Sequence, residues 1–509
     1  MAEAGPQPLT GGAFALAIFV LALANFMAVL DINVVNVAIP YMAGSLGVSN
    51  NEGTWVITSY AIAEAIVVPL TGWLAGRFGG VKVFIIAVIG FGICSVLCGL
   101  SVSFPMLMIG RVAQGLMGAP LMPTSQTLLL RIAPPAQRNM AIGIWSMTTI
   151  AAPVAGPWFG GQIADTIGWQ WLFLINVPVA IACALLAWRL LGKRETEIVR
   201  QPIDYVGLGL LIVWVSALQL MLDNGQDKDW FGSAFIVTCA VISLIGFVAF
   251  VIWEMTDAHP IVDLKVFRHR SFVISAITMF FSMGSFAGTL VIIPLWLQTN
   301  MAYTATSAGR MIALTGLLGV FIAPVAAGLL SKVDPRALVS LGLTLCCGAI
   351  LWRISFASNM TFTQLAIPEM AIGLGLPFFF VTITSLSMSQ MAPEEIASAS
   401  GLANFIRTTS TAFATSLVTT YWSNDAVRSR VELTGVLHQP ETVTGALQSG
   451  GFTQPQALST LSDLVQSQAV MLATNHVFLT LGTIFGLSAL AIWLAPKPAG
   501  QLTPPVESH

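Results

Sequence analysis

The sequence predicts an all-α polytopic membrane protein with 14 transmembrane helices, arranged as two pseudo-repeated six-helix bundles plus two inserted helices. The first observation behind this fold class is composition: of 509 residues, 56% are hydrophobic and only 9% are charged. Globular domains carry about 25% charged residues. A soluble chain of this length would divide into domains with charged surfaces, so lipid is the solvent for most of this one.

The second observation is the number of long apolar runs. A helix of about 20 residues crosses the ~30 Å of hydrocarbon in a bilayer. Fourteen runs of about this length lie at residues 14–39, 54–75, 83–103, 105–130, 140–163, 170–191, 205–222, 231–254, 272–298, 305–330, 337–357, 363–389, 396–421 and 470–495.

The third observation is an internal repeat. RVAQGLMGAP at Arg111 parallels EMAIGLGLPF at Glu369, 258 residues later, and GWLAGRFG at Gly72 has an echo in GLLSKVDPR at Gly328. Parallel six-helix halves of this kind place a substrate path between them. We expect an N-terminal bundle over 1–192, a linker over 193–204, inserted helices over 205–254, a linker over 255–270, a C-terminal bundle over 271–495 and a tail over 496–509.

Basic residues predict the orientation. With the N-terminus inside, the inner loops hold 14 of the 21 Lys and Arg residues and the outer loops hold four, which are Lys228, Arg353, Arg428 and Arg430. This bias places both termini in the cytoplasm. The outer connection at 422–469 is much longer than the others and polar, so we expect short amphipathic helices there, either docking a partner or serving as a linker.

Charged residues inside the predicted spans are the first candidate functional residues. Asp31, Glu64 and Arg111 lie about 13, 15 and 9 Å from the outer ends of their helices at 1.5 Å per residue, so all three can meet. Such charges normally face the bundle interior, pair, and mark an ion or substrate path. A carboxylate that exchanges an arginine for a proton suits proton coupling, although an Asp31–Arg111 pair that only locks two helices would look the same.

The second half holds three more candidates. Glu369 and Arg310 lie at similar depth, about 9–10 Å from the outer edge, and could form a structural pair. Arg407 lies about 16 Å from the inner edge, where it could face an anionic or polar substrate or bond neighbouring carbonyls.

Other function classes are disfavoured. A net charge of −2 argues against a nucleic-acid partner, and the sequence has no GxxxxGK[ST] loop for ATP. The five histidines are scattered and the six cysteines lie in apolar stretches. We therefore expect no metal, no cofactor and no enzymatic activity.

Several motifs resemble the major facilitator superfamily, and within it the fourteen-span drug:proton antiporters of the EmrB/QacA branch. LDINVVNVAIP (30–40) is similar to the first-helix signature of that branch, RVAQG (111–115) to the proton-linked fourth-helix motif, and AGPWFGG (155–161) to the fifth-helix antiporter motif. WQWLFLINVP (169–178) is also typical of the branch, and the long outer loop most resembles its EmrB group.

The resemblance implies roles for matching residues. It gives proton coupling to Asp31 and Arg111, beside Glu64. It gives a hinge and seal to Gly156, Pro157, Gly160 and Gly161. GWLAGRFGGVK (72–82) resembles an inner-loop gating motif in which Gly72, Arg77, Gly79 and Lys82 match, but Gly76 stands where an aspartate is usual. A charge-based latch at that motif is therefore in doubt.

These features together predict a proton-coupled multidrug efflux antiporter in a bacterial inner membrane, exporting lipophilic compounds by alternating access. The resemblance implies an EmrA-like periplasmic adaptor and a TolC-like outer-membrane channel as partners in a tripartite pump. An exporter of one natural metabolite or fatty acid, a sensor that does not transport, and a nutrient symporter remain alternatives, the last disfavoured by the fifth-helix motif.

Overall fold

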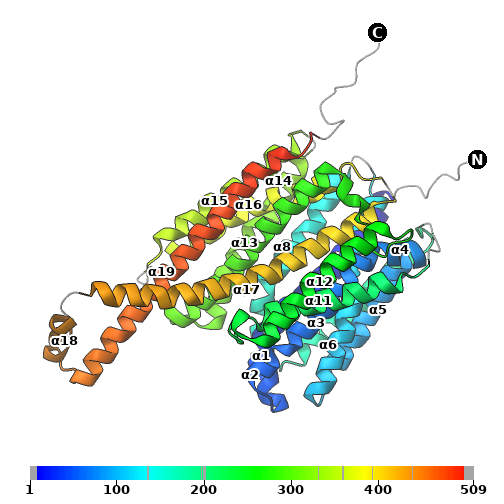
Figure 1. Ribbon diagram of the computed structural model, residues 1–509. Helices are drawn as coiled ribbons and strands as arrows, with labels where there is room; N and C mark the ends of the chain where they lie inside the picture. Colours follow the sequence, from blue (N-terminus) through cyan, green and yellow to red (C-terminus); the bar gives the residue numbers. More distant parts are fainter. Residues whose placement is uncertain are drawn as a thin grey trace, which may run out of the picture.

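The computed structural model describes residues 9–134, 137–196, 198, 202–330, 332–357, 360–392, 394–437 and 440–497. This part of the chain is helical throughout its regular structure and contains no strand. α1 begins and α19 ends at the same end of an elongated bundle (Figure 1), which we call the terminal end. α18 lies at the tip of a projection from the other end, the arm end.

The N-terminal half is built from helices that pass back and forth along the bundle. Its buried core contains large apolar side chains such as Phe84 and Phe91. Its elements are α1 (Gly11–Leu46), α2 (Asn50–Gly53), α3 (Trp55–Val67), η1 (Val68–Leu70), α4 (Thr71–Phe78), α5 (Gly80–Gly99), α6 (Phe104–Gly118), α7 (Leu121–Ile132), α8 (Arg138–Thr166), α9 (Trp171–Leu174) and α10 (Asn176–Leu191).

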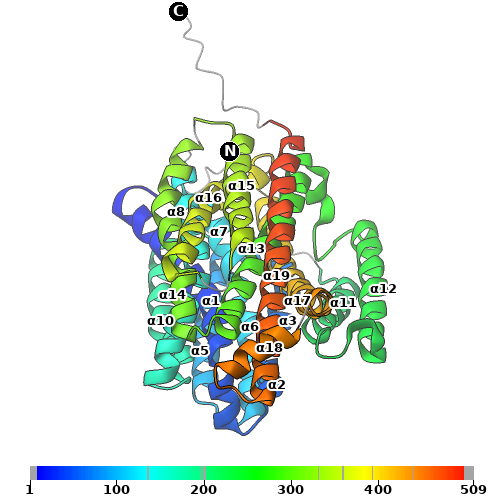
Figure 2. The same cartoon turned by 90° about the vertical axis from the view of Figure 1, so that its left-hand side faces the viewer.

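The inserted helices and the C-terminal half follow. α11 (Tyr205–Asn224) and α12 (Ala234–Thr256) pack on each other at one side of the bundle, beside α17 (Figure 2). After η3 (Trp230–Gly232) and η4 (Leu264–Arg268), the C-terminal half contains α13 (Arg270–Asn300), α14 (Ala305–Leu329), α15 (Pro335–Trp352), η5 (Arg353–Ser355), α16 (Phe362–Met388), α17 (Ile396–Val436), α18 (Pro440–Ser449), α19 (Gln454–Ala491) and η6 (Ile492–Leu494).

The described helices are compatible with the fourteen predicted spans. Eleven are long and apolar enough to cross a membrane, and the bent α8 makes twelve. The remaining two predicted spans correspond to α6 with α7 and to α17, which run through the same bundle (Figure 1). α6 and α7 are each shorter than a span because they are separated at Ala119 and Pro120, and the serine and threonine residues of α17 lower its hydropathy.

The expectation of short helices in 422–469 was wrong for most of that segment. α17 continues without a break to Val436, and α19 already begins at Gln454. Only α18 is a short helix, and the projecting arm is formed mainly by the extended ends of two bundle helices (Figure 1). α1 likewise continues past residue 39, the predicted end of the first span, through Pro40 to Leu46.

The two halves approach each other closely near the terminal end. A Cβ atom on Gly72 of α4 would lie 2.6 Å from the Ser398 hydroxyl of α17, and one on Gly143 of α8 would lie 2.7 Å from Ala327 Cβ of α14. Both glycines are therefore needed for these approaches, because a side chain would push the halves apart. α8 packs along α14 across the middle of the molecule.

α8 also packs tightly on α1 through the glycines of the AGPWFGG segment. A Cβ on Gly156 would lie 2.5 Å from Asn33 Cβ, and one on Gly160 would lie 2.8 Å from the Val34 carbonyl oxygen. Gly161 has open space at the same position. α8 is bent by 50° between Arg138–Pro153 and Trp158–Thr166, so the bend and the close approach coincide.

Gly160 is in tight contact with α1 and Gly161 is not, so adding one methyl group should affect stability differently at the two positions. Gly160→Ala should lower stability by about 1–3 kcal/mol, the usual effect of overpacking a tight contact. Gly161→Ala, its neighbour in open space, should be neutral or slightly stabilising. Thermal unfolding of the purified protein in detergent measures both, and equal effects of the two variants would contradict the packing described here.

Candidate functional site

Asp31 and Arg111 form the predicted buried ion pair. Arg111 Nη1 lies 2.7 Å from Asp31 Oδ2, and both side chains are fully buried. Asp31 Oδ1 accepts hydrogen bonds from Asn176 (2.7 Å) and Gln114 (3.1 Å), while Gln114 also accepts from Arg111 and donates to Ser95. Side chains from α6 and α10 therefore bond the carboxylate of α1 directly, and α5 joins the network through Gln114.

The rest of the Arg111 guanidinium is held by backbone and aromatic groups. Its Nε donates to the Val56 carbonyl at 3.0 Å, and it lies 4.3 Å from the centre of the Tyr60 ring and 5.6 Å from that of Phe173. Cation–π contacts of this kind strengthen when the cation is removed from water. Arg111 Nη2 and the Tyr60 hydroxyl have no hydrogen-bond partner among the described residues.

Sequence reasoning missed the two amide side chains of this network, although the sequence carried a signal for each. Gln114 lies three residues after Arg111 within RVAQG, so both share one helix face. Asn176 lies in WQWLFLINVP, which was noted only as a typical segment. Amides are the suitable neighbours for a buried ion pair because they satisfy the remaining lone pairs without adding charge.

Glu64 lies on α3 near this network but outside it. Its side chain is half-buried, and within the described residues its carboxylate has no hydrogen bond or ion pair. The charges that act on it are those of Arg407, Arg111 and Asp31. Glu64 therefore lies between the Asp31 network of the first half and an arginine of the second.

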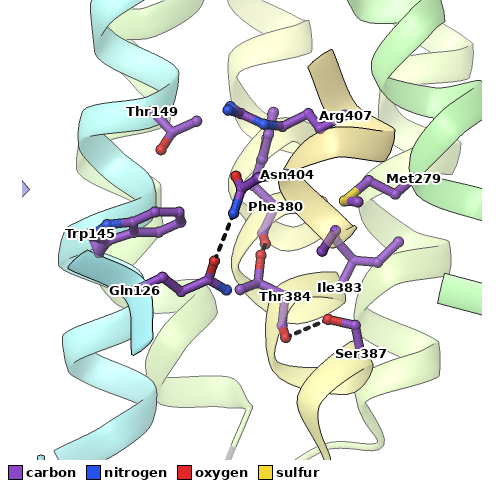
Figure 3. Close-up of a pocket in the computed structure, with 11 residues that line it drawn as sticks. Gln126, Trp145, Thr149, Met279, Phe380, Ile383, Thr384, Ser387, Asn404 and Arg407 are labelled. Atoms are coloured by element: carbon purple, nitrogen blue, oxygen red, sulfur yellow. Dashed lines mark hydrogen bonds between the residues drawn. The ribbon is translucent and has the colours of Figure 1, made fainter. Parts of the chain in front are cut away.

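A cavity lies between the two halves, and Arg407 is one of the residues that line it. It is narrow and partly open to solvent. Figure 3 shows its polar lining and the Arg407 side chain extending towards Thr149. It is lined by Gln126, Trp145 and Thr149 from the first half and by Met279, Phe380, Ile383, Thr384, Ser387, Ala403, Asn404 and Arg407 from the second.

Polar groups in the cavity come from both halves. Asn404 Nδ2 donates to Gln126 Oε1 at 3.2 Å, which joins α17 to α7 (Figure 3). Arg407 contacts the Met122 sulfur, and its buried Nε has no hydrogen-bond partner among the described residues. A guanidinium with free donors beside Trp145 and Phe380 suits a ligand with an apolar body and an acceptor or anionic group.

The expected Glu369–Arg310 pair is wrong. Glu369 of α16 pairs instead with Arg353 of η5 at 2.8 Å, and accepts a hydrogen bond from Thr315 of α14 at 2.8 Å. Arg353 was assigned to an outer loop but is completely buried, with its guanidinium 5.6 Å from the Phe478 ring centre. Arg310 is exposed, and no ion pair reaches it within the described residues.

The gating-motif residues lie at the terminal end, on α4 and at the start of α5. The Arg77 guanidinium lies 5.5 Å from the Trp73 ring centre. Gly79 has φ +93°, which favours glycine. The Lys82 backbone N–H donates to the Glu195 carboxylate at 3.0 Å, so Glu195 holds the beginning of α5.

The antiporter-motif residues lie in the second half of α8. Gly156 and Gly160 face α1 and Gly161 faces open space, as described above. Pro157 belongs to α8, but its side chain lies outside the described residues. Among the residues that the structure describes, no three or more His, Cys, Asp or Glu side chains are arranged to hold a metal ion.

Comparison with known families supports a transporter fold. Residues 21–415 match the model of the Major Facilitator Superfamily. Two solved structures with similar folds are the human organic anion transporter TETRAN, with a TM-score of 0.60 at 12% identity over 95% of this chain and 100% of that chain, and the proton:xylose symporter XylE, with a TM-score of 0.59 at 15% identity over 95% and 96%.

Closer relatives cover nearly the whole chain. The multidrug export protein EmrB of Haemophilus influenzae is 40% identical over 97% of this chain and 98% of that protein. EmrB of Escherichia coli is 39% identical over 97% and 98%. The fatty acid resistance protein FarB of Neisseria gonorrhoeae is 38% identical over 96% and 98%.

The buried Arg353–Glu369 pair predicts a strongly non-additive response. Arg353→Met alone leaves an uncompensated carboxylate and should destabilise the protein by about 3–5 kcal/mol. The double variant Arg353→Met/Glu369→Met removes both charges and should be less destabilised than the single one. Thermal unfolding in detergent measures this, with the exposed Arg310→Met as a neutral control. A double variant less stable than Arg353→Met would count against the pair.

Proposed function

The chain belongs to the Major Facilitator Superfamily, and from that premise we propose that it is a proton-coupled antiporter that exports lipophilic compounds from the cytoplasm or inner leaflet by alternating access. It is a multi-pass membrane protein of a transporter family rather than an enzyme. The names of the EmrB relatives support multidrug export. The observation that carries proton coupling is the Asp31–Arg111 network, a carboxylate fully buried within the helix bundle.

The proposed proton coupling depends on how protonation of Asp31 changes its interaction with Arg111. While Asp31 is ionised, its charge is balanced by Arg111 and its oxygens are held by Asn176 and Gln114. A proton on Asp31 removes that attraction, so Arg111 and the helices tied to it are released. Glu64, between Arg111 and Arg407, provides the second carboxylate through which the proton and the substrate compete.

The cavity between the halves is the proposed substrate site. Its apolar wall, with Trp145, Met279 and Phe380, suits lipophilic bodies of varied shape. The Arg407 Nε at its edge has no hydrogen-bond partner among the described residues, which favours compounds with an anionic or acceptor group. Because α7 and α17 both contribute to the lining, movement of one half against the other alters the site directly.

The proposed assembly is a tripartite pump. The protein acts in a bacterial inner membrane with both termini in the cytoplasm, together with an EmrA-like periplasmic adaptor and a TolC-like outer-membrane channel. The arm formed by α17, α18 and α19 projects from the end opposite the termini (Figure 1), which supports it as the adaptor docking surface. The six-helix halves, 1–192 and 271–495, are the moving parts, and 205–254 is an inserted pair.

A single natural substrate is the second candidate function. The 38% identity to FarB, a fatty acid resistance protein, favours export of fatty acids. The same cavity supports both functions, since a fatty acid combines an apolar chain with a carboxylate. The range of compounds that drive proton movement distinguishes them.

Removing the Asp31 charge should abolish coupling. In everted membrane vesicles with an acidic lumen, addition of a transported compound should release lumenal protons from wild-type protein but not from Asp31→Asn. Substrate binding to the purified variant serves as the control for folding. Full coupling in Asp31→Asn would make Asp31 structural and assign the role to Glu64, whereas no response in wild type across lipophilic anions, cations and fatty acids would favour a sensor.

Replacing Arg407 should change substrate selectivity. Hydrogen bonds to a charged group contribute about 1.5–3 kcal/mol, so Arg407→Gln should weaken transport of lipophilic carboxylates about tenfold or more and leave neutral compounds much less affected. Arg310→Gln removes an exposed arginine and is the matched control. Equal losses for carboxylates and neutral compounds would remove Arg407 from substrate recognition.

A further inference from the structure

Two buried carboxylates meet where the inserted helices begin and end. Asp204 immediately precedes α11 and Glu254 lies in the last turn of α12, and the two residues are 8% and 3% exposed. A Cβ atom on Gly207 would lie 2.5 Å from Glu254 Oε1 and closer still to Asp204 Oδ2. Both oxygens therefore crowd the same point and are close neighbours, and the missing side chain at Gly207 leaves room for them.

The two carboxylates differ in their hydrogen-bond donors. Asp204 Oδ1 accepts the Gly207 backbone N–H at 2.8 Å, and the Trp253 indole N–H lies 3.0 Å from both Asp204 oxygens. Glu254 Oε2 accepts the Val262 backbone N–H at 3.1 Å, but Glu254 Oε1 has no hydrogen-bond partner among the described residues. Donors to a carboxylate favour its ionised form. Asp204 is thus the member suited to remain an anion, and Glu254 Oε1 is the position suited to a proton.

The surroundings of the pair add negative rather than positive charge. The charges that act on Glu254 are those of Asp204 and of Asp257, which follows α12. In the connecting segment, Asp263 accepts the Lys265 backbone N–H at 3.0 Å and His259 is exposed. The other elements contribute apolar residues to the adjoining buried cluster, namely Ala65, Leu70, Phe272, Ala276, Ala399, Leu402 and Ala403. Two buried carboxylates this close do not both ionise readily, so one of them retains a proton.

Glu254 also fixes the segment that leaves α12. Val262, whose backbone N–H it accepts, and Ile261 are each 2% exposed. Both belong to a buried cluster with Trp214 of α11 and Leu402 of α17. The carboxylate pair therefore lies where the inserted helices are joined to the C-terminal half, just before α13 begins.

We propose that Asp204 and Glu254 form a proton site separate from the Asp31 network, in which Glu254 Oε1 carries one proton and donates it in a hydrogen bond to Asp204 Oδ2. Loss of this proton breaks the O–H bond of Glu254, releases the proton to solvent and leaves two adjacent anions that repel each other. The start of α11, the end of α12 and the Val262 segment are then held less firmly. The site fastens the inserted helices to the C-terminal half while it is protonated and loosens them as the pH rises.

Infrared spectroscopy of the purified protein detects the proton through the C=O stretch of a protonated carboxyl group. In wild type, part of this band should disappear when the pH is raised from mildly acidic to alkaline values, and Glu254→Gln should lack that part. Glu394→Gln, which changes an exposed glutamate, should retain it. An unchanged band in Glu254→Gln would mean that Glu254 is ionised, and the proposal would be overturned.

The proton should also make stability depend on pH with a definite sign. The folded protein holds a proton that a glutamate of the unfolded chain has lost at neutral pH, so stability falls as the pH rises. Over the same rise, the melting temperature of wild type should fall by about 2–4 °C more than that of Glu254→Gln. The glutamine amide can donate to Asp204 and accept from Val262 without titrating. Equal falls in the two proteins would contradict the shared proton.

Asp204→Asn keeps the proposal testable if Glu254→Gln does not fold. This change removes the like charge beside Glu254, so Glu254 should ionise more easily. The pH at which the protonated-carboxyl band disappears should move down by about one unit or more. A band that disappears at the wild-type pH in Asp204→Asn would show that the two carboxylates do not share a proton.

Substrate-driven proton release in everted vesicles separates this site from the coupling path. Glu254→Gln should retain the release, because the hydrogen bonds of the pair and those of the Asp31 network share no residue within the described chain. Loss of release in Glu254→Gln would place Glu254 in the coupling path and overturn its assignment to a separate site. An absence of release in wild type would reject the proposed function, while the infrared and melting experiments would still decide the proton site.

Discussion

The ion pair between Asp31 and Arg111 is the constraint on which the first half depends. Each charge alone would be costly within a bilayer, and together they still leave lone pairs and donors to satisfy. Groups from five helices, α1, α3, α5, α6 and α10, satisfy most of them, and Arg111 Nη2 is left without a hydrogen-bond partner among the described residues. While both side chains are charged, their hydrogen bonds tie these helices to one another.

The second half also buries an ion pair, between Glu369 and Arg353. Glu369 follows Arg111 by 258 residues, and Arg353 follows Ser95 by the same 258 residues, so the pair occupies positions of the repeat that hold an arginine and a serine in the first half. Its carboxylate has Thr315 of α14 as a partner, and α14 packs against α8 of the first half. The two halves therefore share one buried charged position, that of Arg111 and Glu369, but the partner of this residue comes from a different position in each half.

The sequence was sufficient for features that depend on the pattern within one helix, such as the position of a span. It was not sufficient for features that depend on contacts between helices, such as the partner of a buried charge. Apolar runs gave the helices, and helical rise placed Asp31 and Arg111 at a common depth, where the structure joins them. Arg353 was misplaced because hydropathy alone makes a basic residue at the end of an apolar run look like a loop residue. Glu369 was given the wrong partner because depth says nothing about which neighbouring helix a side chain faces. The long helices of the arm were missed because a polar segment resembles a loop even when it continues a helix.

The length of α17 has a mechanical consequence. Its 41 residues form one helix, which spans about 60 Å at 1.5 Å per residue. It starts beside Glu395, passes the cavity at Asn404 and Arg407, and continues into the arm. A continuous α-helix transmits rotation and tilt along its length. A partner bound to the arm would therefore act directly on the cavity wall and on the contact between α17 and α4 at the opposite end. α17 thus connects the arm, the cavity and the terminal end mechanically.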